Sequence, residues 1–178
     1  MEKLILVVIA LLIPFSIQAQ QKAGKTSTKV RKPSEQKAVT VKDGYVPVHE
    51  YDPKRDAEKD LQATVEEAKR TNKRILLEVG GLWCIWCRIM DDYFAEHKDL
   101  LDYREKNFIM VKINYSEENK NEAFLSKYPK VAGYPHIFIL DKEGKLLHSQ
   151  NTGDLEEGKS YNYDKFFNFL RTWALPSE

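Results

Sequence analysis

The apolar positions that follow residue 52 first keep the period of an α-helix. They recur at spacings of four, four and three, which puts one apolar stripe on a helix of about four turns: Ala57, Leu61, Val65 and Ala68. Asp52 suits the N-cap of this helix and Pro53 its first position, and Asn72-Lys73 ends it. The segment therefore predicts an amphipathic helix that packs one face on a core.

Two short runs further along are apolar at almost every position, which is typical of strands buried on both faces. They cover residues 75–79, interrupted only by Glu78, and residues 108–113, interrupted only by Lys112. The chain between them has helical character, and we expect that helix to run from the cysteine pair past residue 97 to Tyr103. Strand, helix and strand in this order predict a parallel pair with a right-handed crossover.

The pattern changes after residue 128. A short helix predicted at 119–128 is followed by apolar residues 137–140, a turn with Gly144, and a second strand at 145–148, which together indicate a β-hairpin. A last helix, predicted at 163–173, carries several aromatic residues toward the sheet. The pattern as a whole predicts an α/β fold with a central mixed β-sheet flanked by helices.

The N-terminus differs from the rest of the 178-residue chain. The ten apolar residues 4–13 would span only about 15 Å as a helix, which is half the thickness of a bilayer core. They fit the h-region of a signal peptide over residues 1–19, cleaved after Ala19. We therefore expect a periplasmic or secreted protein. Ile17 is bulky for its place before the cut, so the alternative is a membrane anchor formed by an uncleaved signal.

Residues 20–50 are predicted to be a basic, disordered linker. Seven of the residues from Lys22 to Lys42 are basic and one is acidic, although the whole chain has a formal net charge of only +1. The stretch has too few large apolar residues to fold by itself. A solvated linker is the preferred interpretation over a surface that binds acidic partners, and the folded domain is expected at residues 51–178.

The chemistry centres on Cys84 and Cys87, which are the only two cysteines. At positions i and i+3 of a helix two sulfurs lie on one face, where a disulfide can form and break. A bridge across so short a loop adds little stability, which favours a redox role over an inert staple. Haem attachment would need His where Arg88 stands, and structural zinc would need two more ligands.

Several motifs in order resemble the thioredoxin superfamily over residues 57–173. They are Trp83-Cys84-x-x-Cys87, the carboxylate Glu78 six residues before the first cysteine, Lys112-Ile113-Asn114, and Gly133-Tyr134-Pro135. The resemblance implies a thioredoxin fold with an N-terminal helical extension. It is greatest to exported bacterial thioredoxin-like proteins, although Ile85-Trp86 replaces the Gly-Pro that thioredoxin has between its cysteines.

The resemblance also assigns roles to these residues. Cys84, at a helix N-terminus that favours the thiolate, is expected to be the nucleophile, and Cys87 to resolve the mixed disulfide. Pro135 is expected to be cis and to set the backbone of Tyr134 beside the cysteines, where Tyr134 would contact substrate.

Glu78, desolvated within its strand, is expected to exchange a proton with Cys87. The alternative is that Lys112 simply neutralises Glu78, and Lys112 is a less certain member of the relay. Trp83 and Trp86 are expected to form an apolar rim that binds substrate, although Trp86 is also compatible with the core.

The resulting hypothesis is an exported thiol:disulfide oxidoreductase that reduces protein disulfides. Ile85 and Trp86 bring no charge to stabilise a thiolate, which favours a reductase. The expected partners are protein disulfide substrates and an unidentified thiol electron donor, for example a membrane relay, with no cofactor, metal or nucleic acid; we expect a monomer. The alternative is a thioredoxin-like binding or chaperone module with a non-catalytic disulfide.

Overall fold

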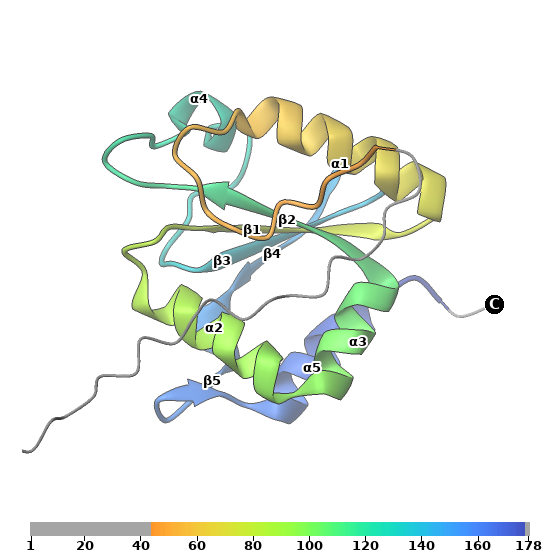
Figure 1. The fold of residues 1–178 in the computed structure, drawn as a ribbon. Helices are drawn as coiled ribbons and strands as arrows, with labels where there is room; N and C mark the ends of the chain where they lie inside the picture. The colour runs from red at the N-terminus through yellow and green to blue at the C-terminus, as the bar shows by residue number, and fades with distance from the viewer. Residues whose placement is uncertain (1–43, 177–178) are drawn as a thin grey trace, which may run out of the picture. The chain divides into compact units, whose positions relative to one another are not determined.

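Four strands form the central sheet of the computed structural model, which describes residues 44–176 (Figure 1). In the order β2-β1-β3-β4 they are β2 (Phe108–Asn114), β1 (Arg74–Gly80), β3 (His136–Leu140) and β4 (Leu146–Asn151). β1 pairs in parallel with β2 and antiparallel with β3, and β3 pairs antiparallel with β4. The predicted mixed sheet is confirmed. The predicted signal peptide and most of the predicted linker lie outside the described residues.

Helices cover both faces of this sheet, as Figure 1 shows. α1 (Ala57–Thr71) and the single turn α4 (Glu122–Leu125) lie on one face. α2 (Ile85–Glu96), α3 (Lys98–Asn107) and α5 (Tyr163–Trp173) lie on the other. The chain between β4 and α5 forms a 3-10 turn, η1 (Thr152–Leu155), and a small hairpin of β5 (Glu156–Glu157) and β6 (Ser160–Tyr161).

The alternation of side chains along β1 divides the core into two layers. Ile75, Leu77 and Val79 pack in the layer under α1, whereas Leu76 packs in the layer under α2 and α5. The same alternation puts Glu78 on the face of Leu76. An acidic side chain therefore lies in the core layer between the sheet and α2.

The predicted boundaries of three helices are wrong. α1 begins at Ala57 and not at Pro53, because Asp52 accepts from the backbone N–H of Lys54 at 2.8 Å and closes a turn. Asp56 is the N-cap instead, and its carboxylate accepts from two backbone N–H groups of the first turn.

The other two predicted helices follow β1 and β2. The helix expected to run on to Tyr103 breaks at His97, whose φ of −106° and ψ of 80° are not helical, so α2 and α3 are separate. α4 begins only after Asn121, which has a left-handed φ of 47°, and it ends at Leu125 rather than at 128.

The N-terminal boundary of the folded domain also differs from the prediction. Val48, placed in the linker by the sequence, is 5% exposed and pairs in parallel with Val111 of β2. Its carbonyl accepts from the backbone N–H of Lys112 at 2.9 Å. The ordered domain therefore begins before residue 51. The pairing of Val48 with β2 also places Tyr51 in the interior.

Candidate active site

The two cysteines lie at the start of α2, shortly after the end of β1. Cys84 is the N-cap of α2, and its sulfur accepts from the backbone N–H of Cys87 at 3.1 Å. The two residues form a disulfide, and their side chains are 2% and 1% exposed. The predicted pairing and the predicted position at a helix N-terminus are both found.

An apolar rim surrounds Cys84 on the solvent side. Leu82, Trp83 and Ile85 are 67%, 54% and 62% exposed, and they include most of the large apolar side chains exposed among residues 44–176. The Trp83 ring meets the edge of Tyr134, with centroids 5.5 Å apart. Two residues that were predicted to bind substrate thus lie together beside Cys84.

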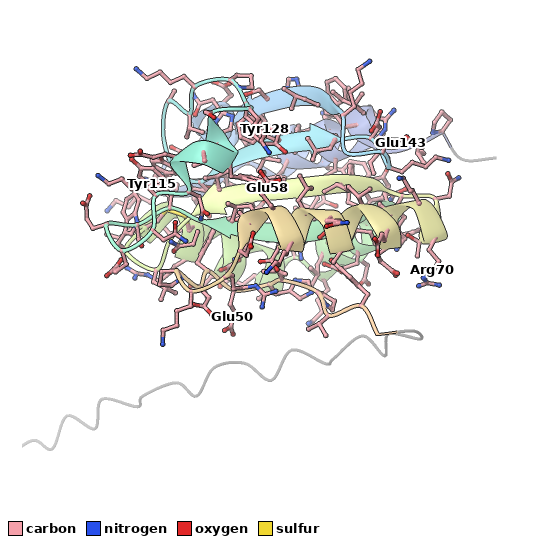
Figure 2. All side chains as sticks on the ribbon, turned by 90° about the horizontal axis from the view of Figure 1, so that it is seen from above. Glu50, Glu58, Arg70, Tyr115, Tyr128 and Glu143 are labelled. Carbon is pink, nitrogen blue, oxygen red and sulfur yellow. A yellow bond between two sulfur atoms is a disulfide. The ribbon has the colours of Figure 1, made fainter. Side chains whose placement is uncertain are left out.

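Tyr115 orders this rim. Its carbonyl accepts from Trp83 Nε1 at 2.7 Å, and its ring stacks on Tyr134 with centroids 4.8 Å apart. Figure 2 shows Tyr115 at the end of the sheet where α4 lies, opposite the end that carries Glu143. The rim is therefore built at one end of the sheet, away from the turn of the β3–β4 hairpin.

The loop before β3 contributes Pro135. The Tyr134–Pro135 peptide bond is cis, as predicted from the sequence. The Pro135 carbonyl accepts from the hydroxyl of Thr152 at 2.6 Å, and Thr152 is 2% exposed. Thr152, which the sequence did not single out, ties this loop to η1.

Trp86 lies apart from the exposed rim. Its half-buried ring meets the edge of Tyr161 with centroids 5.7 Å apart, and its carbonyl accepts from the Tyr161 hydroxyl at 3.4 Å. This is the core position that the sequence left open as an alternative. Trp86 also packs against the cluster of Tyr51, Cys84 and Cys87, and its contact with substrate stays a prediction.

A buried polar network lies behind the disulfide. Glu78 is 1% exposed and Lys112 is 4% exposed, and Lys112 Nζ lies 3.8 Å from Glu78 Oε1. Lys112 Nζ also donates to both carboxylate oxygens of Asp91, at 2.6 and 2.7 Å. The Tyr51 hydroxyl donates a short hydrogen bond to Glu78 Oε1. The sequence-based pairing of Glu78 with Lys112 is present, but it is part of a larger set.

Burial dominates the electrostatics of this network. Desolvation raises the pKa of Glu78; Lys112 opposes that rise, and Asp91 adds to it. Desolvation, and then the nearby Glu78 charge, raise the pKa of Tyr51 well above its ordinary value. Tyr51 therefore keeps its proton at neutral pH, while Glu78 can take one up more readily than an exposed carboxylate.

Tyr51 also contacts the cysteine pair. It packs with Cys84 and Cys87 in one buried cluster. A β carbon placed on Gly80 would stand 2.5 Å from Cys87 Sγ and 2.6 Å from the Tyr51 hydroxyl oxygen, so both atoms border the same point. The absence of a side chain at Gly80 leaves room for both atoms beside this point.

Tyr51 and Asp91 are the two members of the buried polar network that the sequence did not indicate. Asp91 follows Cys87 by four residues on a helix, a spacing that places both on one face and could have indicated it. Tyr51, the first residue of the predicted domain, carries no local signal, because it contacts Glu78 only through the tertiary fold.

Residues 44–176 contain no group of three or more His, Cys, Asp or Glu side chains placed to hold a metal ion. None of the helices described there combines the length and the apolar character that crossing a bilayer requires.

Comparison with known proteins agrees with this architecture. A protein-family model described as thioredoxin-like matches residues 56–142. The chain has a thioredoxin-like fold. A solved structure described as a disulphide isomerase from Xylella fastidiosa Temecula1 has a TM-score of 0.59 and 25% identity, and the alignment covers 68% of this chain and 94% of that one.

Two curated proteins to which the chain is similar carry related names. The "Disulfide bond reductase DsbH" of Chlamydia pneumoniae is 29% identical over 92 residues, which are 47% of this chain and 55% of the relative. The "Thiol:disulfide interchange protein DsbD" of Vibrio cholerae is 23% identical over 99 residues, which are 55% of this chain and 16% of the relative. The matches thus span about half of one relative and a small part of the other.

Proposed function

We propose that the protein is a thiol:disulfide oxidoreductase that reduces disulfides in other proteins through Cys84 and Cys87. The observation that carries this proposal is the buried Cys84–Cys87 disulfide at the N-terminus of α2, beside a cis-proline loop and in front of a buried acid. The similarity to a relative named a disulfide bond reductase supports reduction as the direction.

The reaction begins with the reduced pair. The backbone N–H groups and dipole at the start of α2 favour the Cys84 thiolate, which attacks one sulfur of a substrate disulfide. The substrate S–S bond breaks, a mixed disulfide with Cys84 forms, and the other substrate sulfur leaves as a thiolate. This step uses only the Cys84 sulfur.

Cys87 completes the exchange. It loses its proton, with Glu78 as the ultimate acceptor, and its thiolate attacks Cys84 Sγ. The Cys84–Cys87 disulfide forms, the bond to the substrate breaks, and the second substrate sulfur leaves as a thiolate. The substrate disulfide gains two electrons and the protein dithiol loses them, so a dithiol donor must reduce Cys84–Cys87 for the next turnover.

The rim indicates how a protein substrate would bind. Leu82 and Trp83 offer exposed apolar area, and Tyr134 presents its backbone next to Pro135, where an extended segment could add main-chain hydrogen bonds. An extended peptide with an apolar residue near its disulfide is the substrate that this surface fits.

Export is part of the proposal. The predicted signal peptide favours a site of action outside the cytoplasm, where disulfides persist and a reductase has substrates. The likeness to a part of a thiol:disulfide interchange protein supports a dithiol protein as the electron donor.

The test is reduction of insulin by the full chain with dithiothreitol as donor, together with trapping by Cys87→Ala. We expect wild-type turnover, a stable mixed disulfide between Cys84 and substrate in Cys87→Ala, and loss of turnover in Cys84→Ser. Substrate capture that survives Cys84→Ser, with no dithiol turnover in the wild type, would replace the enzyme with a binding or chaperone module. A glutathione redox titration of the pair then measures whether its potential suits a reductase.

A further inference from the structure

The carboxylate that should receive the Cys87 proton is held by another side chain. The hydrogen bond that Glu78 accepts comes from the hydroxyl of Tyr51, which is itself 7% exposed. Tyr51 reaches this place from a segment that runs along β2, anchored by the pairing of Val48 with Val111. Its hydroxyl therefore has a fixed acceptor on one side.

The Tyr51 hydroxyl oxygen and Cys87 Sγ both lie close to one point beside Gly80. The oxygen and Cys87 Sγ lie 2.6 and 2.5 Å from the point where a β carbon on Gly80 would stand. Tyr51 also packs on the disulfide in the same buried cluster. A phenol hydroxyl can donate one hydrogen bond and accept others, so Tyr51 can face the acid and the thiol together.

From this geometry we propose that Tyr51 is the proton-relay residue between Cys87 and Glu78. The proposal rests on the function proposed above and names the route of its second step. As Cys87 attacks Cys84 Sγ in the mixed disulfide, the Cys87 thiol proton passes to the Tyr51 oxygen, and the Tyr51 hydroxyl proton passes to Glu78. Tyr51 ends neutral, Glu78 ends protonated, and the substrate sulfur leaves with the electron pair of the broken bond.

The surrounding charges suit this route. Burial raises the pKa of Glu78 and that of Tyr51, so the acid can hold the proton and the phenol does not ionise on the way. Lys112 Nζ, 3.8 Å from Glu78 and 4.8 Å from the centre of the Tyr51 ring, opposes protonation of Glu78 and returns it to the carboxylate form afterwards. The charged and titratable groups that act on the Glu78–Tyr51 pair come from every element around it: Asp91 of α2, Arg104 of α3, Lys112 of β2 and Tyr161 of β6.

The test follows a single turnover of the reduced full chain with oxidised glutathione between pH 5.5 and 8.5. Samples quenched with acid and weighed by mass spectrometry separate formation of the Cys84–glutathione mixed disulfide from its resolution by Cys87. Tyr51→Phe removes only the hydroxyl. We expect it to slow resolution roughly 100-fold near pH 6 and to make the rate rise about tenfold per pH unit, as hydroxide replaces the lost base. Formation of the mixed disulfide should change less than about twofold.

Tyr93→Phe is the matched control, because the Tyr93 hydroxyl is buried in α2 without a hydrogen-bond partner. It should leave both steps and their pH profiles unchanged. Glu78→Gln should reproduce the slow, pH-dependent resolution of Tyr51→Phe even if the latter variant folds poorly. The double variant should be no slower than either single one, because the two groups act as one unit.

Three results would overturn the relay. They are resolution by Tyr51→Phe at the wild-type rate, a slowing by the same factor at every pH, and additive losses in the double variant. A wild-type protein that forms no mixed disulfide would instead remove the proposed function, and the relay with it. Normal wild-type turnover with an unaffected Tyr51→Phe removes the relay alone.

Discussion

Gly80→Ala tests how tightly the site is packed. The added β carbon would stand 2.5 Å from Cys87 Sγ and 2.6 and 2.8 Å from two atoms of Tyr51, all closer than side-chain atoms approach. None of these atoms can move freely, because Cys87 forms a disulfide with Cys84 and the Tyr51 hydroxyl donates a hydrogen bond to Glu78. Overpacking of this kind costs about 1–3 kcal/mol, which changes the unfolding equilibrium about 5- to 150-fold.

Gly133→Ala is the control for this substitution. No atom outside its chain neighbours lies within 4 Å of a β carbon at Gly133, and its φ is not in the left-handed region. Loss of chain entropy in the unfolded state should stabilise this variant by about 0.4–1 kcal/mol. Urea unfolding of the oxidised proteins at pH 7, followed by tryptophan fluorescence, should therefore rank Gly133→Ala above wild type and Gly80→Ala below it. A Gly80→Ala protein as stable as Gly133→Ala would refute the packing argument.

Three further predictions concern the buried polar groups. The folded-state pKa of Glu78 is raised above its ordinary value of 4.5, so the wild-type protein loses stability as the pH rises from 4.5 through the folded-state pKa. Each pKa unit of this rise corresponds to about 1.4 kcal/mol of unfolding free energy. Urea unfolding at pH 4.5 and pH 8 should show this loss in wild type and not in Glu78→Gln. Thr152→Val should destabilise the protein by about 1–3 kcal/mol in urea unfolding because it leaves the Pro135 carbonyl unpaired, whereas Thr152→Ser should keep most of that stability. Asp91→Asn removes a charge that raises the pKa of Glu78, so the pH profile of mixed-disulfide resolution should move to lower pH; a shift to higher pH would show that Asp91 acts chiefly by restraining Lys112.

The parts of the fold with a strong periodic signal were predictable from the sequence. α5 spans the predicted residues 163–173, and the two buried strands lie within one residue of their predicted bounds. Helix boundaries were less so, because Asp52 and Asp56 are both plausible N-caps and only the turn closed by Asp52 decides between them.

The candidate site was predictable where its residues belong to motifs that are local in sequence. Cys84, Cys87 and the cis peptide bond at Pro135 are of this kind. Tyr51 was not, because its contact with Glu78 joins residues 27 positions apart, and no local pattern records such a contact. Trp86 belongs to the local motif, but the sequence left open whether its side chain lies at the rim or in the core. That choice depends on how α2 packs on Tyr161.

The pairing of Val48 with β2 determines how short a fragment of this protein can be and still keep its chemistry. β2 is an outer strand of the sheet, and unpaired outer strands invite association with other chains. A fragment that began at residue 56, where the family match begins, would uncover part of this strand and lose the phenol behind the disulfide in one cut. The smallest fragment suited to activity measurements therefore starts upstream of Val48.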